Sequence, residues 1–282
     1  MRTTIYIGFT IVFTLHTNEA FKLPRPLAKQ RIAHLLRRDE AEKPKTFEDS
    51  DCLSTLKSDG IALVNHGITL LNSSIKTTGR FFEALEDLYS TDINTVLTTV
   101  SDTLKKADKQ AAVDFKKFMD VDLDKSAIYV YTDWIYDDVN YSLRSHKCGK
   151  KKLTEKDKNL APYTAYLMAV MLYSPNLRKE SNFTYREVSF KQEFVDQYKV
   201  GTTFLWSSFT SSSMYDLDFT GNVEFVFNNS RESIWSPRRI EEYSRYPEEE
   251  EALYPPAAIF SVTEKHEKGN KVYIYADLVS ED

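Results

Sequence analysis

Four consecutive glutamates, Glu248 to Glu251, are the residues of this chain best suited to acid–base chemistry. They follow a tyrosine-proline pair and lead into a short apolar stretch, which indicates an extended backbone. Because side chains alternate along a strand, Glu249 and Glu251 are expected on one face, about 7 Å apart, with Glu250 on the other. Two such carboxylates can divide a reaction, one stabilising positive charge on a sugar carbon and the other handling the nucleophile. A solvated run of charges is the alternative interpretation.

Two further segments accompany the acidic run in a set order. The first is Tyr185-Arg186-Glu187-Val188, and the second runs from Tyr198-Lys199-Val200-Gly201 to Phe209-Thr210-Ser211-Ser212-Ser213. With the acidic run as third block, they resemble the arginine-serine-glutamate signature of the mono-ADP-ribosyltransferases, specifically the arginine-directed ectoenzyme family. The resemblance covers roughly residues 125 to 275. It implies an α+β fold, a compact split β-sandwich whose two small sheets form the NAD cleft, with an N-terminal helical layer on one side.

The resemblance also implies a role for each of four residues, with NAD as co-substrate. Arg186 would bind the pyrophosphate through its planar guanidinium, and Ser211 would hold the nicotinamide ribose and position Glu251. Glu251 would be ionised and would stabilise the oxocarbenium-like state as nicotinamide leaves. Glu249 would orient the acceptor arginine and assist its deprotonation. The family usually has glycine where this chain has Glu187, so a carboxylate follows the expected phosphate-binding arginine.

Residues 238–247, which we call the acceptor loop, resemble the segment with which the family recognises its target. Tyr243 and Tyr246 are candidates for surfaces on which the target stacks. Packing of both tyrosines beneath the loop is an equally good interpretation. The partner that the resemblance implies is a protein with an exposed arginine.

Composition disfavours several other classes of function. The formal net charge of −5 argues against a nucleic-acid partner. With 8 glycines, the chain has no glycine-rich phosphate-binding loop, so a dinucleotide has to be bound by side chains. The histidines and cysteines lack the spacing of metal ligands, and no metal is expected. No histidine lies in a motif that would activate Ser211 as a nucleophile.

The first 20 residues have the pattern of a secretory signal peptide, with Arg2 before an apolar stretch from Ile5 to Leu15 and a cleavage site near Ala20. The apolar stretch is too short to span a bilayer as a helix, and the charged C-terminus does not resemble a GPI signal. Secretion to the extracellular space without a stable membrane anchor is therefore expected. Residues 21–50 are expected to form a leader or surface segment.

Cysteines and sequons fit an extracellular protein. Cys52 and Cys148 are the two cysteines, and in an oxidising compartment they are expected to form a disulfide, with two unpaired thiols as the alternative. Sequons for N-glycosylation are present at four asparagines, Asn72, Asn140, Asn182 and Asn228.

The hydrophobic pattern of the expected catalytic domain, residues 51–282, changes near residue 175 from helical to strand-like. In the first part, an amphipathic helix packed on a sheet is expected over Leu160–Tyr173, beginning after Thr154. Ile128–Tyr131 has the one strand-like pattern there, and His66 is expected in a turn. In the second part, strands are expected at 185–190, 204–213, 223–227, 252–254, 259–263 and 272–278, with a hairpin at Lys268-Gly269-Asn270.

The three blocks favour a secreted NAD-dependent protein-arginine mono-ADP-ribosyltransferase. An NAD glycohydrolase, in which water replaces the acceptor, is the enzymatic alternative. A catalytically inactive relative that acts as an extracellular binding protein is the alternative from another class, and Glu187 is its sequence hint. A glycosidase that uses only the carboxylate pair would leave Arg186 and the serine block unexplained.

Overall fold

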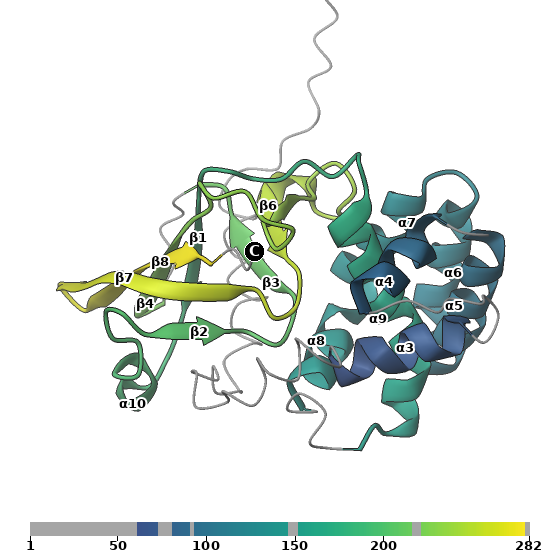
Figure 1. The fold of residues 1–282 in the computed structure, drawn as a ribbon, viewed down its shortest axis with the longest axis horizontal. Coiled ribbons are helices and arrows are strands. Elements are labelled where there is room, and N and C mark those ends of the chain that lie inside the picture. Colours follow the sequence, from purple (N-terminus) through teal and green to yellow (C-terminus); the bar gives the residue numbers. More distant parts are fainter. Residues whose placement is uncertain (1–60, 73–80, 91–92, 146–151, 216–220, 280–282) are drawn as a thin grey trace, which may run out of the picture.

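The computed structural model describes residues 61–72, 81–90, 93–145, 152–215 and 221–279. Helices occupy the first part of the described chain and an eight-stranded sheet the second part. Figure 1 shows the helices of this first part gathered on one side of the molecule and the strands on the other. The α+β class expected from the sequence is confirmed. The expected signal peptide and leader, and the pair Cys52 and Cys148, lie outside the described residues and stay predictions.

The helical layer contains the segments that precede the sheet. Its elements are α3 (Ala62–Asn72), α4 (Phe81–Ser90), α5 (Ile93–Ala107), α6 (Lys109–Met119), α7 (Leu123–Val130), the π-helix η2 (Tyr131–Ile135), α8 (Tyr136–Ser145) and α9 (Glu155–Tyr173). Two of these helices begin at an aspartate whose carboxylate accepts a backbone N–H of the first turn, Asp108 for α6 and Asp122 for α7.

Helix α9 lies at the centre of this layer. Thr154 caps its N-terminus and forms a reciprocal capping box with Asp157, as the predicted start requires. The helix is buried on every side rather than amphipathic, because α3, α4, α5, α7 and α8 pack around it. A Cβ atom on Gly67 of α3 would lie 2.1 Å from the Ala161 carbonyl oxygen, so glycine permits the close approach of α3 and α9. His66 therefore lies in a packed helix, and its expected position in a turn was wrong.

The sheet has the strand order β2-β7-β8-β4-β1-β3-β6-β5. Its strands are β1 (Phe183–Val188), β2 (Thr203–Leu205), β3 (Thr210–Ser213), β4 (Val223–Asn228), β5 (Arg238–Arg239), β6 (Glu251–Tyr254), β7 (Ile259–Lys268) and β8 (Lys271–Leu278), with the short helices α10 (Gln192–Val195) and η3 (Pro247–Glu249) between them. Only β4 and β8 run parallel; the other neighbours in this order are antiparallel. The predicted hairpin is confirmed, and Gly269 has the positive φ of 67° that its turn requires.

The pairing of β1 divides the sheet into two parts. Strand β1 pairs with β4 along its whole length but with β3 at one position, Tyr185 opposite Ser213. Five strands thus form one part and β3, β6 and β5 the other, which is the split that the resemblance implied. The two parts have different packing partners: Leu253 of β6 joins the core of the helical layer, whereas Phe225 and Phe227 of β4 join a second, aromatic core within the sheet.

Two predicted elements differ from the structure. The strand-like Ile128–Tyr131 lies in α7 and the start of η2, because its apolar side chains are buried among helices that surround it on both sides. The single strand expected over residues 204–213 is two strands, β2 and β3, which pair with different neighbours. Among the described residues, the helices are too short or too polar to cross a membrane.

Candidate active site

Three neighbouring strands bring Arg186, Ser211 and Glu251 together. Arg186 is on β1, Ser211 on β3, and Glu251 is the first residue of β6. Strand β3 lies between the other two, and Ser213 of β3 pairs with both Tyr185 and Glu251. The three residues span 65 positions of chain, so their proximity is a product of the strand order rather than of the sequence.

The Arg186 guanidinium is buried and held on two sides. Its Nη1 donates a hydrogen bond of 2.6 Å to the backbone carbonyl of Ser211. Its Cζ lies 5.4 Å from the centre of the Trp206 ring, a cation–π distance. Trp206 is in turn fixed by its indole N–H, which donates to the Tyr198 hydroxyl at 3.3 Å. Trp206 therefore forms the wall beside the arginine.

The Glu251 carboxylate is 6% exposed and has two polar neighbours from the other strands. Burial raises the pKa of Glu251 to about 7, against the lowering effects of the Ser211 hydroxyl, which donates to it, and of the Arg186 charge. Ser211 thus touches both partners, through its backbone carbonyl to Arg186 and through its side chain to Glu251. A buried carboxyl group with a pKa near 7, beside a guanidinium that is held in place, is an arrangement found at catalytic sites.

The acidic run does not adopt the extended backbone expected from the sequence. Glu249 ends the 3₁₀-helix η3, Glu250 has the left-handed conformation with φ 47° and ψ 48°, and only Glu251 begins a strand. The strand-based reason for placing Glu249 and Glu251 on one face was therefore wrong. Both carboxylates are nevertheless buried, whereas Glu250 is exposed. The solvated-run interpretation fails for Glu249 and Glu251, because both side chains are buried.

Glu187 points away from Arg186, since neighbouring residues of a strand face opposite sides. Its carboxylate pairs with the ammonium of Lys271, which also lies 2.5 Å from the carboxylate of Glu224. Glu224 is opposite Glu187 in the β1–β4 register. The residue that replaces the family's usual glycine therefore belongs to an ion-pair cluster on the other face of the sheet.

A family model for NAD:arginine ADP-ribosyltransferase matches residues 91–281. This chain belongs to that family. The match spans most of the helical layer and the whole sheet, and it contains all three blocks from which the resemblance was drawn. Members of this family take NAD as co-substrate for ADP-ribosyl transfer to proteins. No curated protein matches the chain.

Several solved structures are similar to this chain at low sequence identity. The type III effector XopAI of Xanthomonas axonopodis pv. citri is 16% identical, with a TM-score of 0.45, over 91% of this chain and 98% of that one. C3stau2 of S. aureus, solved with NAD, is 18% identical, with a TM-score of 0.45, over 56% of this chain and 87% of that one. HopU1 of Pseudomonas syringae pv. tomato is 17% identical, with a TM-score of 0.44, over 76% of this chain and 96% of that one.

In this ADP-ribosyltransferase the acceptor loop packs against the helical layer. Tyr246 is buried, and its hydroxyl donates to Asp133 at 3.1 Å. Tyr243 is half-buried against the core of the helical layer. These contacts favour the packing interpretation of both tyrosines, and their part in acceptor recognition stays a prediction. The contact with Asp133 joins residues 113 positions apart, and no sequence pattern indicates it.

Arg238, at the start of the acceptor loop, was not singled out from the sequence. Its buried guanidinium donates to the Met171 and Leu172 carbonyls at 2.7 and 2.8 Å. These groups belong to the last turn of α9, where carbonyls lack helical partners. Burial lowers the pKa of Arg238 to about 10. Because Arg238 is in β5, which pairs with β6, it ties the central helix to the strand that carries Glu251.

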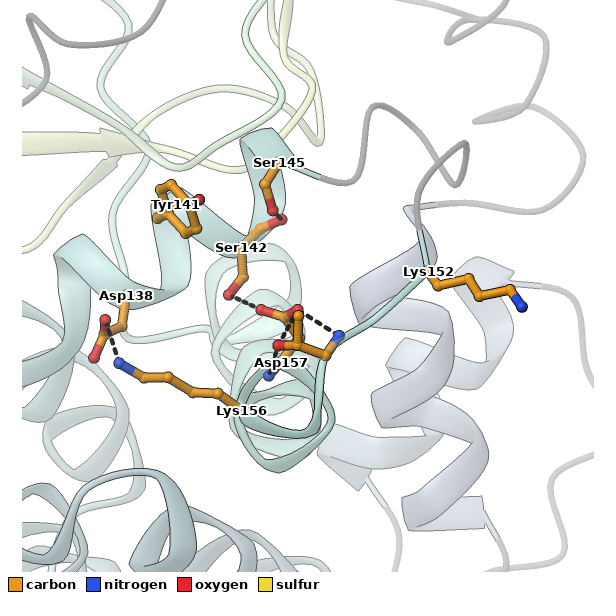
Figure 2. Close-up of a pocket in the computed structure, with 8 residues that line it drawn as sticks. Asp138, Tyr141, Ser142, Ser145, Lys152, Lys156 and Asp157 are labelled. Atoms are coloured by element: carbon orange, nitrogen blue, oxygen red, sulfur yellow. Dashed lines mark hydrogen bonds and ion pairs between the residues drawn. The ribbon is translucent and has the colours of Figure 1, made fainter.

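A pocket of about 340 Å³ lies elsewhere in this family member, between α8 and the start of α9. Figure 2 shows that its polar groups bond to one another, Ser142 to Asp157 and Lys156 to Asp138. The Thr154 hydroxyl also bonds to Asp157. The contact between Thr154 and Asp157 is part of the capping box of α9. The pocket is lined by none of Arg186, Ser211 and Glu251 and is not part of the candidate site.

The structure also bears on the sequons and on metal binding. Asn140 is buried and its amide donates to the Tyr131 hydroxyl at 2.9 Å, so this sequon is not accessible to a glycan in the folded protein. Asn182 is exposed, and the Asn228 amide bonds to Asp277. Within the described residues, His, Cys, Asp and Glu form no group of three or more arranged to hold a metal ion.

Proposed function

We propose that this chain is a secreted NAD-dependent protein-arginine mono-ADP-ribosyltransferase. The observation that carries the proposal is the contact of Arg186 and Glu251 through Ser211 across three strands. A guanidinium, a hydroxyl and a carboxylate supply the charges and hydrogen-bonding groups that the pyrophosphate and ribose of NAD require. The family membership supplies the co-substrate.

In the proposed reaction, the bond between the nicotinamide nitrogen and the ribose breaks, and its electron pair stays on nicotinamide. The ionised Glu251 stabilises the positive charge that develops on the anomeric carbon, and Ser211 holds the carboxylate in place. Arg186 holds the phosphates so that the ribose stays beside Glu251. A guanidinium nitrogen of the acceptor arginine then bonds to the anomeric carbon and loses a proton, which Glu249 accepts.

The choice of arginine as acceptor rests on Glu249 together with the family assignment. An acceptor guanidinium is positively charged in water and is a poor nucleophile until it loses a proton. A carboxylate two residues before Glu251 can orient it and take that proton. The burial of Glu249 beside the acceptor loop supports this role.

Glu187 was the sequence hint for a catalytically inactive relative. Its pairing with Lys271, on the face of β1 opposite Arg186, keeps its carboxylate away from the phosphates that Arg186 would bind. NAD hydrolysis without transfer is retained as an outcome of the experiment.

The deciding experiment incubates the purified protein with NAD and either an arginine-rich or a lysine-rich polypeptide of equal length. We expect ADP-ribose on the arginine polymer, and nicotinamide release with either. Glu249→Gln is expected to lower transfer to arginine about 100-fold while nicotinamide release persists. Equal modification of both polymers would contradict arginine specificity, and nicotinamide release without any transfer would identify a glycohydrolase.

Secretion is proposed from the signal-peptide pattern and is tested separately. The protein expressed with its full N-terminus in a secreting eukaryotic host is expected in the medium, with a new N-terminus near residue 21. Retention in the cell with Met1 intact would contradict this part of the proposal. Electrophoresis of the secreted protein with and without reductant tests the Cys52–Cys148 bridge.

A further inference from the structure

The π-helix η2 is the part of the helical layer that contacts the acceptor loop. It lies between α7 and α8, and π-helical turns of this kind often mark functional positions. The backbone N–H of Arg245 donates to Thr132 Oγ1 at 2.9 Å, and the Tyr246 hydroxyl donates to Asp133 Oδ1 at 3.1 Å. Two consecutive residues of η2 therefore hold two consecutive residues of the loop.

These contacts differ in strength. Arg245 also forms an ion pair with Asp133, Nε to Oδ2 at 3.6 Å, but the arginine side chain is half exposed. Exposed pairs of this length contribute little. Tyr246 and Asp133 are far less exposed, so the charge-assisted bond between them is expected to be the stronger constraint. The Asp133–Tyr246 bond is the main anchor of the loop on η2.

A short turn connects this anchored tyrosine to Glu249. The Tyr246 carbonyl accepts the N–H of Glu249 at 3.1 Å, and the Pro247 carbonyl accepts the N–H of Glu250 at 3.3 Å. Pro247 has a restricted φ, and Glu250 is in the left-handed region. With so little freedom in the turn, the position of Tyr246 determines where Glu249 lies.

We propose that Asp133 is a positioning residue for transfer to the acceptor: through Tyr246 it directs Glu249 at the acceptor arginine. This inference rests on the proposed function. It assigns to the helical layer a part in acceptor selection, whereas NAD chemistry depends on Arg186, Ser211 and Glu251, which strand pairing holds in place. Loss of the anchor should therefore lower transfer far more than nicotinamide release.

The test compares Asp133→Ala with the matched control Asp138→Ala in the full-length protein. Asp138 is five residues further along, partly exposed, and paired with Lys156 rather than with the loop. We expect Asp133→Ala to lower transfer to the arginine-rich polypeptide about tenfold or more, mainly in kcat, with nicotinamide release within about twofold of wild type. Asp133→Asn keeps an oxygen that can accept from Tyr246, so it should recover most of the transfer. The control should match wild type.

A double-mutant cycle tests the path through Tyr246. Tyr246→Phe keeps the ring and removes the hydroxyl, so Asp133→Ala and Tyr246→Phe combined should lower transfer no more than either change does singly. Additive losses would show that Asp133 acts by another route and would overturn the proposed path.

Amide hydrogen exchange of residues 244–250 gives a readout that does not require activity. We expect faster exchange there in Asp133→Ala than in wild type or the control. Unchanged exchange, or equal loss of transfer and nicotinamide release, would overturn the inference. A wild-type protein that releases nicotinamide but modifies no arginine would instead contradict the proposed function, and the exchange data would still decide whether Asp133 holds the loop.

Discussion

Two buried glutamates on this sheet, Glu251 and Glu187, differ in what neutralises their charge. Burial raises the pKa of both carboxyl groups. Glu187 shares the Lys271 ammonium with Glu224, so its charge is neutralised within the fold. Glu251 accepts a hydrogen bond from Ser211 and has the positive charge of Arg186 nearby, and Arg186 donates to a backbone carbonyl. Burial therefore does not identify the reactive residue. The two residues differ in whether the carboxylate forms a direct ion pair with a charged side chain of the protein.

The pKa of Lys271 reflects its direct pairing with Glu187 and Glu224. Desolvation alone would lower the pKa of Lys271, and its bonds to Glu187 and Glu224 together raise it above its usual value. The Lys271 ammonium is thus held in its charged form, and its pairing with Glu187 and Glu224 links strands β1, β4 and β8. The Glu251 site carries a charge that burial disfavours, which is expected where a substrate supplies the balancing charge.

The largest effect expected from this comparison is that of Glu251→Gln on catalysis. Glutamine keeps the shape and can still bond to Ser211, but it cannot stabilise a developing positive charge. Nicotinamide release should fall about 10³-fold. At pH 8 the free energy of unfolding should rise by about 1–3 kcal/mol, because a buried charge has been removed. Activity near that of wild type, measured with labelled NAD, would show that the two glutamates do not differ as proposed.

Lys271→Met should lower stability and leave activity almost unchanged, the reverse of what is expected for Glu251→Gln. It leaves Glu187 and Glu224 buried without their ammonium, so chemical denaturation should show a loss of about 3 kcal/mol in stability. Activity per folded molecule, measured at low temperature, should stay within about threefold of wild type. Lys268→Met, an exposed change in the same hairpin, is the control and should alter stability by less than about 0.5 kcal/mol.

The pH dependence sharpens the role of Glu251. The ionised form is required, so kcat/KM for NAD should fall about tenfold per pH unit below the pKa of about 7 and level off above it. The folded pKa lies above the ordinary value of 4.5, so the folded state binds more protons in this interval. The contribution of Glu251 to stability should therefore decrease as pH rises from about 4.5 to 7, and the stability gained by Glu251→Gln should grow over the same range. A gain independent of pH would contradict the assigned pKa.

The smallest effect is expected for Glu187→Gln. One carboxylate remains to pair with Lys271, and the side chain faces away from Arg186, so kcat/KM for NAD should stay within about twofold of wild type. If Glu187 instead repelled the phosphates, removing its charge would lower the KM for NAD severalfold. Steady-state kinetics at low ionic strength distinguishes the two outcomes, since electrostatic effects are least screened there.

Local patterns were sufficient for much of the fold. The capping residue Thr154, the β7–β8 hairpin and most strands were predicted from spacing and turn residues, because these signals depend on neighbours within a few positions. Prediction failed where burial overrode local preference. Ile128–Tyr131 has β-branched and aromatic residues, yet it is helical because helices pack around it. Gly67 beside His66 suggested a turn, but glycine is required there for close helix packing.

For the candidate site, too, some features follow from the sequence and others only from the tertiary structure. The sequence by itself indicated which arginine, serine and glutamate residues could act together, since they occur in order in three short blocks that resemble the family signature. Tertiary structure alone decided that Ser211 joins Arg186 to Glu251, that Glu187 belongs to Lys271, and that Asp133 holds Tyr246. These contacts link residues 25 to 113 positions apart. Such pairs leave no periodic trace in a single sequence, because strand order and packing, rather than local conformational preference, bring them together.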